Sequence, residues 1–255
     1  MTRVLRSFLW AAGVILAGYF VAWTFGLFVV GPLVLYWFVT GRILVRGYWN
    51  LVSTVLQGRV IILLNHPSLF FETFVIGGLL FPWYLIFPQC FVWSLPDKRL
   101  LDQWKLPGVI RIALRCVELD RSKRIANGRG GVNTSELLRT GWVFVGHPER
   151  GRTFGEANRH RIPVERNGRI MQKIEEKSRL TLIAYKSGAW ILPGHIHVPY
   201  NEPISITASF RRMFGRENTK YRPVVFSFKR PKYRPQDPFE LERENERLQG
   251  EIFSS

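Results

Sequence analysis

A long N-terminal segment without a single charged side chain constrains this sequence more than any other feature. Residues 7–41 contain no Asp, Glu, Lys, Arg or His. A membrane span needs about 18–20 apolar residues. One helix of about 35 residues would reach roughly 52 Å, against a hydrocarbon core of about 30 Å. We therefore expect membrane attachment, but not by one perpendicular span.

Gly31 and Pro32 divide this segment, because a proline inside a helix kinks or ends it. The sequence predicts an apolar helix near residues 8–29 and a second element from about residue 32, which becomes interfacial past Arg42. Two arrangements stay open, one span with a tilted extension or a re-entrant pair of helices. Residues 1–50 are thus the predicted membrane anchor. Basic residues flank both ends, so the large basic body alone favours the cytoplasmic face for the remainder.

The remaining residues, 51–255, suffice for one domain with a real core. Lys and Arg number 36 and Asp and Glu 19, which gives a net charge of +17. Such a chain suits an anionic membrane, a phosphorylated substrate or nucleic acid. No nucleic-acid recognition motif accompanies the charge, so we expect no nucleic-acid partner.

Cysteine and histidine usage argues against two further classes. The two cysteines, Cys90 and Cys116, are too few for a disulfide scaffold and lack zinc-site spacing. His195 and His197 share one face of a predicted strand, but no suitably spaced Cys or carboxylate completes a zinc site. We therefore expect no metal.

Apolar runs and helical segments alternate along residues 51–255. Strands are expected at residues 59–64, 87–93, 116–119, 141–145, 181–185, 189–198 and 224–229. Helices are expected at residues 69–80, where Phe81-Pro82 ends the helix, at 134–139 and at 238–253, with a Gly-rich loop at 122–131. This alternation with short connections predicts an α/β fold, a mostly parallel sheet flanked by helices.

Three polar clusters follow apolar runs, at the points where strands are expected to end. They are Asn65-His66-Pro67-Ser68, Asp120-Arg121 and His147-Pro148-Glu149-Arg150-Gly151-Arg152. Functional residues of α/β sheets gather outside the carboxyl ends of the strands. We therefore expect the three clusters to line one crevice.

His66 is the best candidate for a catalytic group. Imidazole titrates near neutral pH and can take a proton from a hydroxyl as a general base. Such a base works best beside a carboxylate that holds its tautomer and stabilises the imidazolium. Glu72 is the only carboxylate between residues 46 and 86. A purely structural histidine at a strand end is the alternative interpretation.

Arg121 and Arg152 are candidate anion clamps, because a guanidinium binds phosphate in a bidentate manner. Gly151 lets the backbone approach a ligand closely. Glu149 lies near two arginines and either pairs with them, positions them or binds a ligand hydroxyl. A solvated basic surface is the alternative for the arginines.

These clusters resemble the motifs of the glycerolipid acyltransferases, of which the 1-acylglycerol-3-phosphate acyltransferases are members. Asn65-His66-Pro67-Ser68 with Glu72 resembles the first motif, a histidine followed after four residues by an acid. Cys116-Val117-Glu118-Leu119-Asp120-Arg121 resembles the second, an apolar strand that closes on Asp-Arg. His147-Pro148-Glu149-Arg150-Gly151-Arg152-Thr153 resembles the third, Phe-Pro-Glu-Gly-Thr-Arg. Ala189-Trp190-Ile191-Leu192-Pro193 resembles the fourth, an apolar stretch with a key proline. The four fall in order across roughly residues 40–200.

Three positions depart from the family pattern. Glu72 stands six residues after His66, whereas the family has its acid at five, the place of Phe71 here. Either the turn holds one extra residue or Glu72 is not the partner of His66. In the third motif His147 replaces Phe and Arg150 replaces Gly.

The resemblance implies a membrane-bound O-acyltransferase. It would move an acyl chain from an acyl thioester to the hydroxyl of a lyso-glycerophospholipid, by default 1-acylglycerol-3-phosphate, giving phosphatidic acid. His66 would be the general base and Glu72 would orient it, with no covalent enzyme intermediate. Residues implied in substrate binding are Arg121, Glu149, Gly151, Arg152 and Pro193.

No cofactor is implied beyond the co-substrate, which is acyl-coenzyme A or acyl-carrier protein. The membrane lipid is the implied partner. Two alternatives stay open. One is an acyltransferase for a different lyso-lipid acceptor, and the other is a catalytically inactive, membrane-tethered lipid-binding protein.

Overall fold

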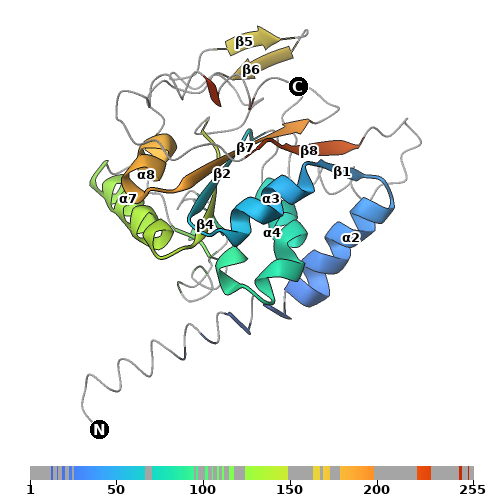
Figure 1. Ribbon diagram of the computed structural model, residues 1–255, viewed down its shortest axis with the longest axis horizontal. Coiled ribbons are helices and arrows are strands. Elements are labelled where there is room, and N and C mark those ends of the chain that lie inside the picture. The colour runs from blue at the N-terminus through green and yellow to red at the C-terminus, as the bar shows by residue number, and fades with distance from the viewer. Residues whose placement is uncertain are drawn as a thin grey trace.

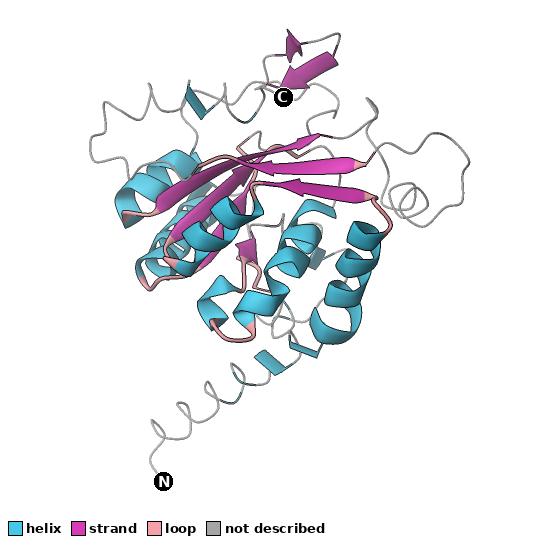
Figure 2. Cartoon of the chain, turned by 45° about the vertical axis from the view of Figure 1, so that its right-hand side comes forward, coloured by secondary structure: helices cyan, strands magenta, loops and turns pink. Residues whose placement is uncertain are grey.

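The computed structural model describes residues 26–66, 71–94, 124–148, 163–166, 169–172, 179–197 and 223–230, with a few isolated positions besides. Helices flank a twisted sheet on both of its faces (Figures 1 and 2). The described chain is therefore an α/β fold, as the sequence predicts.

Six strands form the sheet, in the order β1-β8-β7-β2-β4-β3. Their bounds are β1 (Ile43–Arg46), β2 (Val60–Leu64), β3 (Trp93–Ser94), β4 (Val143–Gly146), β7 (Trp190–His197) and β8 (Val224–Phe228). Every neighbouring pair is parallel except β7 and β8, which are antiparallel. The expected mostly parallel sheet is confirmed. A separate antiparallel pair joins β5 (Pro163–Arg166) to β6 (Arg169–Gln172).

The described helices divide between two hydrophobic cores, one on each face of the sheet. Their bounds are η1 (Gly26–Val30), α2 (Gly31–Val39), α3 (Tyr48–Leu56), α4 (Phe71–Tyr84), η2 (Pro88–Cys90), α7 (Arg124–Arg139) and α8 (Arg179–Ser187). Here η1 is a π-helix and η2 a 3₁₀-helix. The α2, α3 and α4 helices cover one face, and α7 and α8 cover the other.

Strand β2 lies at the centre of this arrangement, and all five of its residues are buried. Successive side chains of a strand point to opposite faces. Accordingly Val60, Ile62 and Leu64 enter the core beneath α2, α3 and α4, whereas Ile61 and Leu63 enter the core beneath α7 and α8. A strand buried on both faces reads as a continuous apolar run, which is why the sequence predicted it correctly.

The helical N-terminal region changes from a π-helix to an α-helix at Gly31. The π-helix η1 passes directly into α2 there, and Pro32 lies in the first turn of α2, where its missing N–H costs least. The helix predicted near residues 8–29 lies mostly outside the described residues. In the part of the chain that the structure describes, we find no helix long and apolar enough to cross a membrane.

Past Arg42 the structure differs from the expected interfacial element. Residues 43–46 form strand β1, which pairs in parallel with β8 at the edge of the sheet. Ile43 is fully buried and Leu44 is exposed, so the strand turns only alternate residues towards the core. Four residues are too few for this alternation to stand out in the sequence.

The Gly-rich stretch at residues 122–131 was expected to be a loop, but α7 begins at Arg124 and includes most of it. Tertiary packing overrides the low helix propensity of glycine here. Gly130 is buried, and its carbonyl accepts a hydrogen bond of 2.8 Å from the Thr134 hydroxyl. A β-carbon added to Gly131 would lie 3.8 Å from Ile183 of α8, which is an ordinary van der Waals contact, so the two helices are close neighbours at this point.

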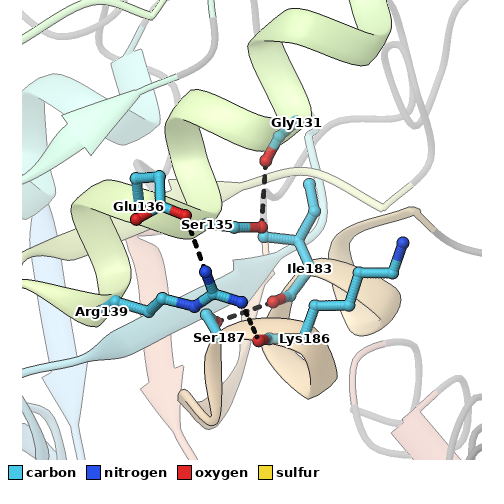
Figure 3. Close-up of polar contacts among 7 residues, drawn as sticks. All are labelled: Gly131, Ser135, Glu136, Arg139, Ile183, Lys186 and Ser187. Atoms are coloured by element: carbon cyan, nitrogen blue, oxygen red, sulfur yellow. Dashed lines mark hydrogen bonds and ion pairs between the residues drawn. The ribbon is translucent and has the colours of Figure 1, made fainter.

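The predicted strand at residues 181–185 is also wrong, because these residues belong to helix α8. Thr181, Ala184 and Ser187 are its buried positions, and this spacing is helical. Figure 3 shows how α8 is tied to α7. Arg139 of α7 forms an ion pair of 2.7 Å with Glu136 and donates a 3.0 Å hydrogen bond to the carbonyl of Lys186.

Two further expectations between β2 and β4 need correction. Helix α4 continues through Pro82 to Tyr84, because a proline two residues before the end removes only one hydrogen bond from the last turn. The strand expected at residues 87–93 is instead the short helix η2 followed by the two-residue strand β3.

Candidate active site

The carboxyl end of β2 carries Asn65 and His66 out of the sheet. Asn65 is buried and binds the neighbouring strand β7 through both ends of its amide. Its Nδ2 donates to the carbonyl of Ile196 at 2.9 Å, and its Oδ1 accepts from the Ile196 N–H at 2.6 Å. The side chain of Asn65 thereby prolongs the ladder between the two strands. The backbone that leads into His66 is held in one direction.

The structure brings His66 and Glu72 together. His66 Nδ1 lies 3.4 Å from Glu72 Oε1. Glu72 is in the first turn of α4, and its side chain is 2% exposed against 21% for His66. Contacts of this kind are often long without substrate and shorten when it binds. The acid at the six-residue spacing is therefore in place beside the imidazole.

The charge of Glu72 depends on this contact. Burial by itself raises the pKa of the carboxyl, but attraction to His66, and to a lesser extent to His147, outweighs burial and lowers the pKa to about 2. The N-terminal end of a helix also favours a negative charge. Glu72 is consequently ionised at neutral pH, and a buried anion of this kind is able to stabilise a proton on His66.

His147 is a third member of the site. The sequence placed it in a polar cluster expected to line the same crevice as His66, but assigned no role to its side chain. It follows β4 directly, and the β2–β4 register pairs Leu63 with Gly146. The rings of His147 and His66 are stacked, with centroids 4.3 Å apart and planes 14° from parallel. His147 Nδ1 also lies 3.1 Å from the carbonyl oxygen of Leu64.

His147 is neutral at neutral pH. Burial is the main cause, and the nearby His66 adds to it, so the pKa of His147 falls to about 4. A carbonyl oxygen only accepts hydrogen bonds, so Nδ1 of His147 carries the hydrogen that is donated to Leu64. The site therefore combines two parallel imidazoles with one buried carboxylate.

The other predicted site residues fall into two groups. Arg121, Glu149, Gly151 and Arg152 lie outside the described residues, so their substrate-binding roles stay predictions. Pro193 is buried within β7, opposite Leu63 of β2, and its carbonyl accepts a 2.9 Å hydrogen bond from Lys229.

Among the described residues, no group of three or more His, Cys, Asp or Glu side chains is arranged so that it could hold a metal ion. His195, one of the two strand histidines, is buried, and its Nδ1 donates a hydrogen bond to the carbonyl of Ile252 near the C-terminus. His195 therefore ties β7 to a distant part of the chain.

The fold of this chain is similar to that of a solved acyltransferase. A similar solved structure is the crystal structure of the 1-acyl-sn-glycerophosphate (LPA) acyltransferase PlsC from Thermotoga maritima. The match has a TM-score of 0.50 and 19% sequence identity, and covers 97% of this chain and 95% of that chain. No family model and no curated protein matches the sequence. At this identity the similarity concerns the fold, and it agrees with the family that the four motifs resemble.

Proposed function

We propose that this protein is a glycerolipid O-acyltransferase. It transfers an acyl chain from an acyl thioester to the hydroxyl of a lyso-glycerophospholipid, with 1-acylglycerol-3-phosphate as the default acceptor and phosphatidic acid as the product. One observation carries the proposal above all. His66, at the carboxyl end of a buried parallel strand, is in contact with the buried and ionised Glu72. The similarity of the fold to that of a solved 1-acyl-sn-glycerophosphate acyltransferase supports it.

The contact suggests how the reaction proceeds. With Nδ1 of His66 turned to Glu72, Nε2 is the nitrogen left to accept a proton from the acceptor hydroxyl. The hydroxyl oxygen attacks the thioester carbonyl as its proton moves to Nε2. Collapse of the tetrahedral intermediate breaks the carbon–sulfur bond, and the thiolate takes the proton back from His66. An ester and a free thiol result, and no covalent enzyme intermediate is needed.

Glu72 stabilises the protonated form of His66 that exists during the reaction. While His66 holds the extra proton it carries a positive charge, and the buried carboxylate lies 3.4 Å away. In a water-excluded site such an interaction is stronger than in solvent. Because Glu72 is ionised before substrate arrives, this stabilisation requires no further charge movement.

We assign the acceptor's phosphate or headgroup to Arg121 and Arg152, aided by Glu149, Gly151 and Pro193. Guanidinium groups suit a lipid phosphate because they bind it with two parallel hydrogen bonds. Arg150, which replaces the glycine of the family motif, favours testing acceptors with other headgroups. Both acyl-coenzyme A and acyl-carrier protein remain candidate donors.

We further propose that residues 1–50 attach the protein to the membrane, with the catalytic residues on the cytoplasmic face. Helices η1 and α2 expose large apolar side chains, which are uncommon on a surface that faces only water. Phe28 of η1 and Val39 of α2 are 72% and 75% exposed. Large exposed apolar patches mark contacts with a membrane or a partner. Attachment places the site beside both lipid substrates.

Acyl transfer by purified protein tests the reaction. Wild type, His66→Ala and Glu72→Gln in detergent receive labelled acyl-coenzyme A or acyl-carrier protein with a panel of lyso-lipids. We expect wild type to acylate one acceptor. His66→Ala should lose about 10²–10⁴-fold in kcat, the range for a general acid–base group. Glu72→Gln should lose a comparable factor because it keeps the shape and removes the charge.

A folded His66→Ala protein with wild-type turnover would contradict the assignment of the base. The matched control is Glu136→Gln, which makes the same change as Glu72→Gln in an exposed carboxylate of α7. It should leave kcat within about threefold, since surface substitutions away from a site have small effects. If wild type binds labelled lyso-lipid but transfers no acyl chain from either donor, the protein is a lipid-binding protein instead.

A further inference from the structure

The stack between His66 and His147 joins two strands at the edge where the site lies. Strands β2 and β4 are parallel neighbours, and the last residue of β4, Gly146, pairs with Leu63. His147 follows immediately, so its backbone lies next to Leu64, whose carbonyl it binds. From this position its ring covers one face of the His66 imidazole. The contact between the two rings therefore follows from the register of β4 against β2.

The direction of the Leu64 bond determines what His147 can contribute. Its Nδ1 is committed as a donor, so the ring cannot rotate without losing a partly buried hydrogen bond. Losing such a bond would take from the carbonyl of Leu64 the donor that His147 supplies, which is unfavourable. His147 is neutral while Glu72 is ionised, so His147 does not compete with His66 for the carboxylate. It presents a rigid, uncharged, flat surface.

The Glu72 contact holds the Nδ1 edge of the His66 ring, with Oε1 3.4 Å from Nδ1. The imidazole turns about the bond that joins it to its β-carbon, and such a turn tilts both faces of the ring. The stacked ring of His147 blocks that rotation from one side. The two contacts together define the plane of His66 and therefore the direction of its Nε2 atom.

We propose that His147 is a positioning residue, a platform that holds the imidazole of His66 in the plane required for proton transfer. The inference rests on the proposed acyltransferase function, and it identifies a residue that acts through His66 without touching the substrate. Misplacing a reacting group by about 1 Å can cost about 10²-fold in rate. The effect of losing the platform should therefore fall on kcat and leave KM nearly unchanged.

Three variants separate the ring of His147 from its hydrogen bond. His147→Phe keeps a flat ring and removes the donor to Leu64, His147→Gln keeps a donor without a ring, and His147→Ala removes both. We expect kcat to fall by about 10–100-fold in the Ala and Gln variants. The Phe variant should stay within about threefold of wild type, and KM for both substrates should change by less than about threefold in all of them.

Glu136→Gln again serves as the control away from the site, and thermal melting confirms that each variant is folded. Wild-type kcat in folded His147→Gln would overturn the proposal. A Phe variant as slow as the Gln variant would also overturn it, because the ring would then not be the useful feature. If His147→Ala does not fold, the comparison of kcat between His147→Phe and His147→Gln tests the proposal.

A second measurement does not depend on enzymatic activity. Exchange of the C2 hydrogen of each histidine ring with deuterated solvent is measured by mass spectrometry of the separated peptides. With the platform removed, one face of His66 opens to water, so exchange at His66 should be several-fold faster in the Gln variant and close to wild type in the Phe variant. Unchanged exchange in His147→Gln would overturn the platform even in an active enzyme. Altered exchange in a protein without acyl transfer would overturn the proposed function and retain the contact.

Discussion

Glu72 and His147 both bind protons less readily in the folded chain than in the unfolded one. The pKa of Glu72 falls from 4.5 to about 2, and that of His147 from 6.5 to about 4. Where the unfolded state binds more protons, stability rises with pH. The Glu72 contribution is complete above pH 4.5 and is lost as the pH falls towards 2. His147 costs nothing above its unfolded pKa and destabilises the fold as the pH falls from 6.5 to 4.

The destabilisation that His147 causes at low pH gives a prediction for His147→Phe. At pH 7.5 the variant should be less stable than wild type, because the carbonyl of Leu64 loses its donor. Between pH 6.5 and 4 only wild type carries the cost of keeping His147 neutral, on the order of 1–3 kcal/mol. We therefore expect the gap in Tm to shrink by several degrees over this range or to reverse. Thermal melts at half-unit pH steps measure it, and a gap independent of pH would contradict the prediction.

The site shows which residues local sequence can identify and which need the fold. His66 and Glu72 were found because a titratable side chain after an apolar run and the only nearby carboxylate are visible in the chain itself. That Glu72 contacts the ring was undecided, because one helical step turns a side chain by about 100°. The contact of His147 with His66 was not visible, since it depends on the register of β2 against β4.

At the scale of elements, the four inner strands of the sheet were the most predictable. β2, β4, β7 and β8 each lie within or close to the predicted ranges, because an apolar run bounded by turn residues carries the information locally. Helix α8 was mistaken for a strand because the helical spacing of its buried positions is explained only by its packing against α7 and the sheet. The glycines of α7 suggested a loop, because glycine has a low helix propensity.

Helix α4 offers a direct test of packing through two adjacent glycines. A β-carbon added to Gly78 would lie 2.3 Å from Cγ2 of Val34 in α2, whereas one added to Gly77 meets nothing within 4 Å. Gly78→Ala should therefore destabilise the protein by about 1–3 kcal/mol through overpacking. Gly77→Ala should stabilise it by up to about 1 kcal/mol, because alanine restricts the unfolded chain and favours the helix.

Equilibrium unfolding of both variants measures these differences, and each serves as the control for the other. They share a helix, a substitution and a change in volume, and they differ in what faces the new methyl group. A shift of the same sign and size in both would mean that α2 does not pack against α4 as described.

For the whole molecule, Arg115 links the N-terminal segment to the sheet. Its guanidinium lies 4.4 Å from the ring centre of Tyr19, 4.9 Å from that of Trp93 in β3 and 4.3 Å from that of Trp142. Cation–π contacts of this kind strengthen when they are removed from water, and Arg115 is buried. The segment that we assign to the membrane is thus connected to the strands that lead to the site.

The distribution of apolar side chains over the molecule gives a prediction about membrane binding. Phe28 and Phe38, on η1 and α2, are exposed, and so are Val132 and Leu182 on α7 and α8. If the first pair enters the bilayer, replacing both by serine removes apolar area that would otherwise leave water. Each phenylalanine is worth about 1.5–3 kcal/mol when fully buried, so vesicle affinity should fall by at least about tenfold. Flotation with vesicles that contain anionic phospholipid measures the loss.

The pair Val132→Ser with Leu182→Ser is the matched control, because it removes exposed apolar side chains from the helices on the other face of the sheet. It should float as wild type does. High salt weakens only the electrostatic part of binding, so it should reduce flotation of wild type partly and leave the serine variant of residues 28 and 38 hardly bound. Equal flotation of both double variants would mean that other residues bind the protein to the bilayer. The assignment of η1 and α2 to the membrane surface would then be wrong.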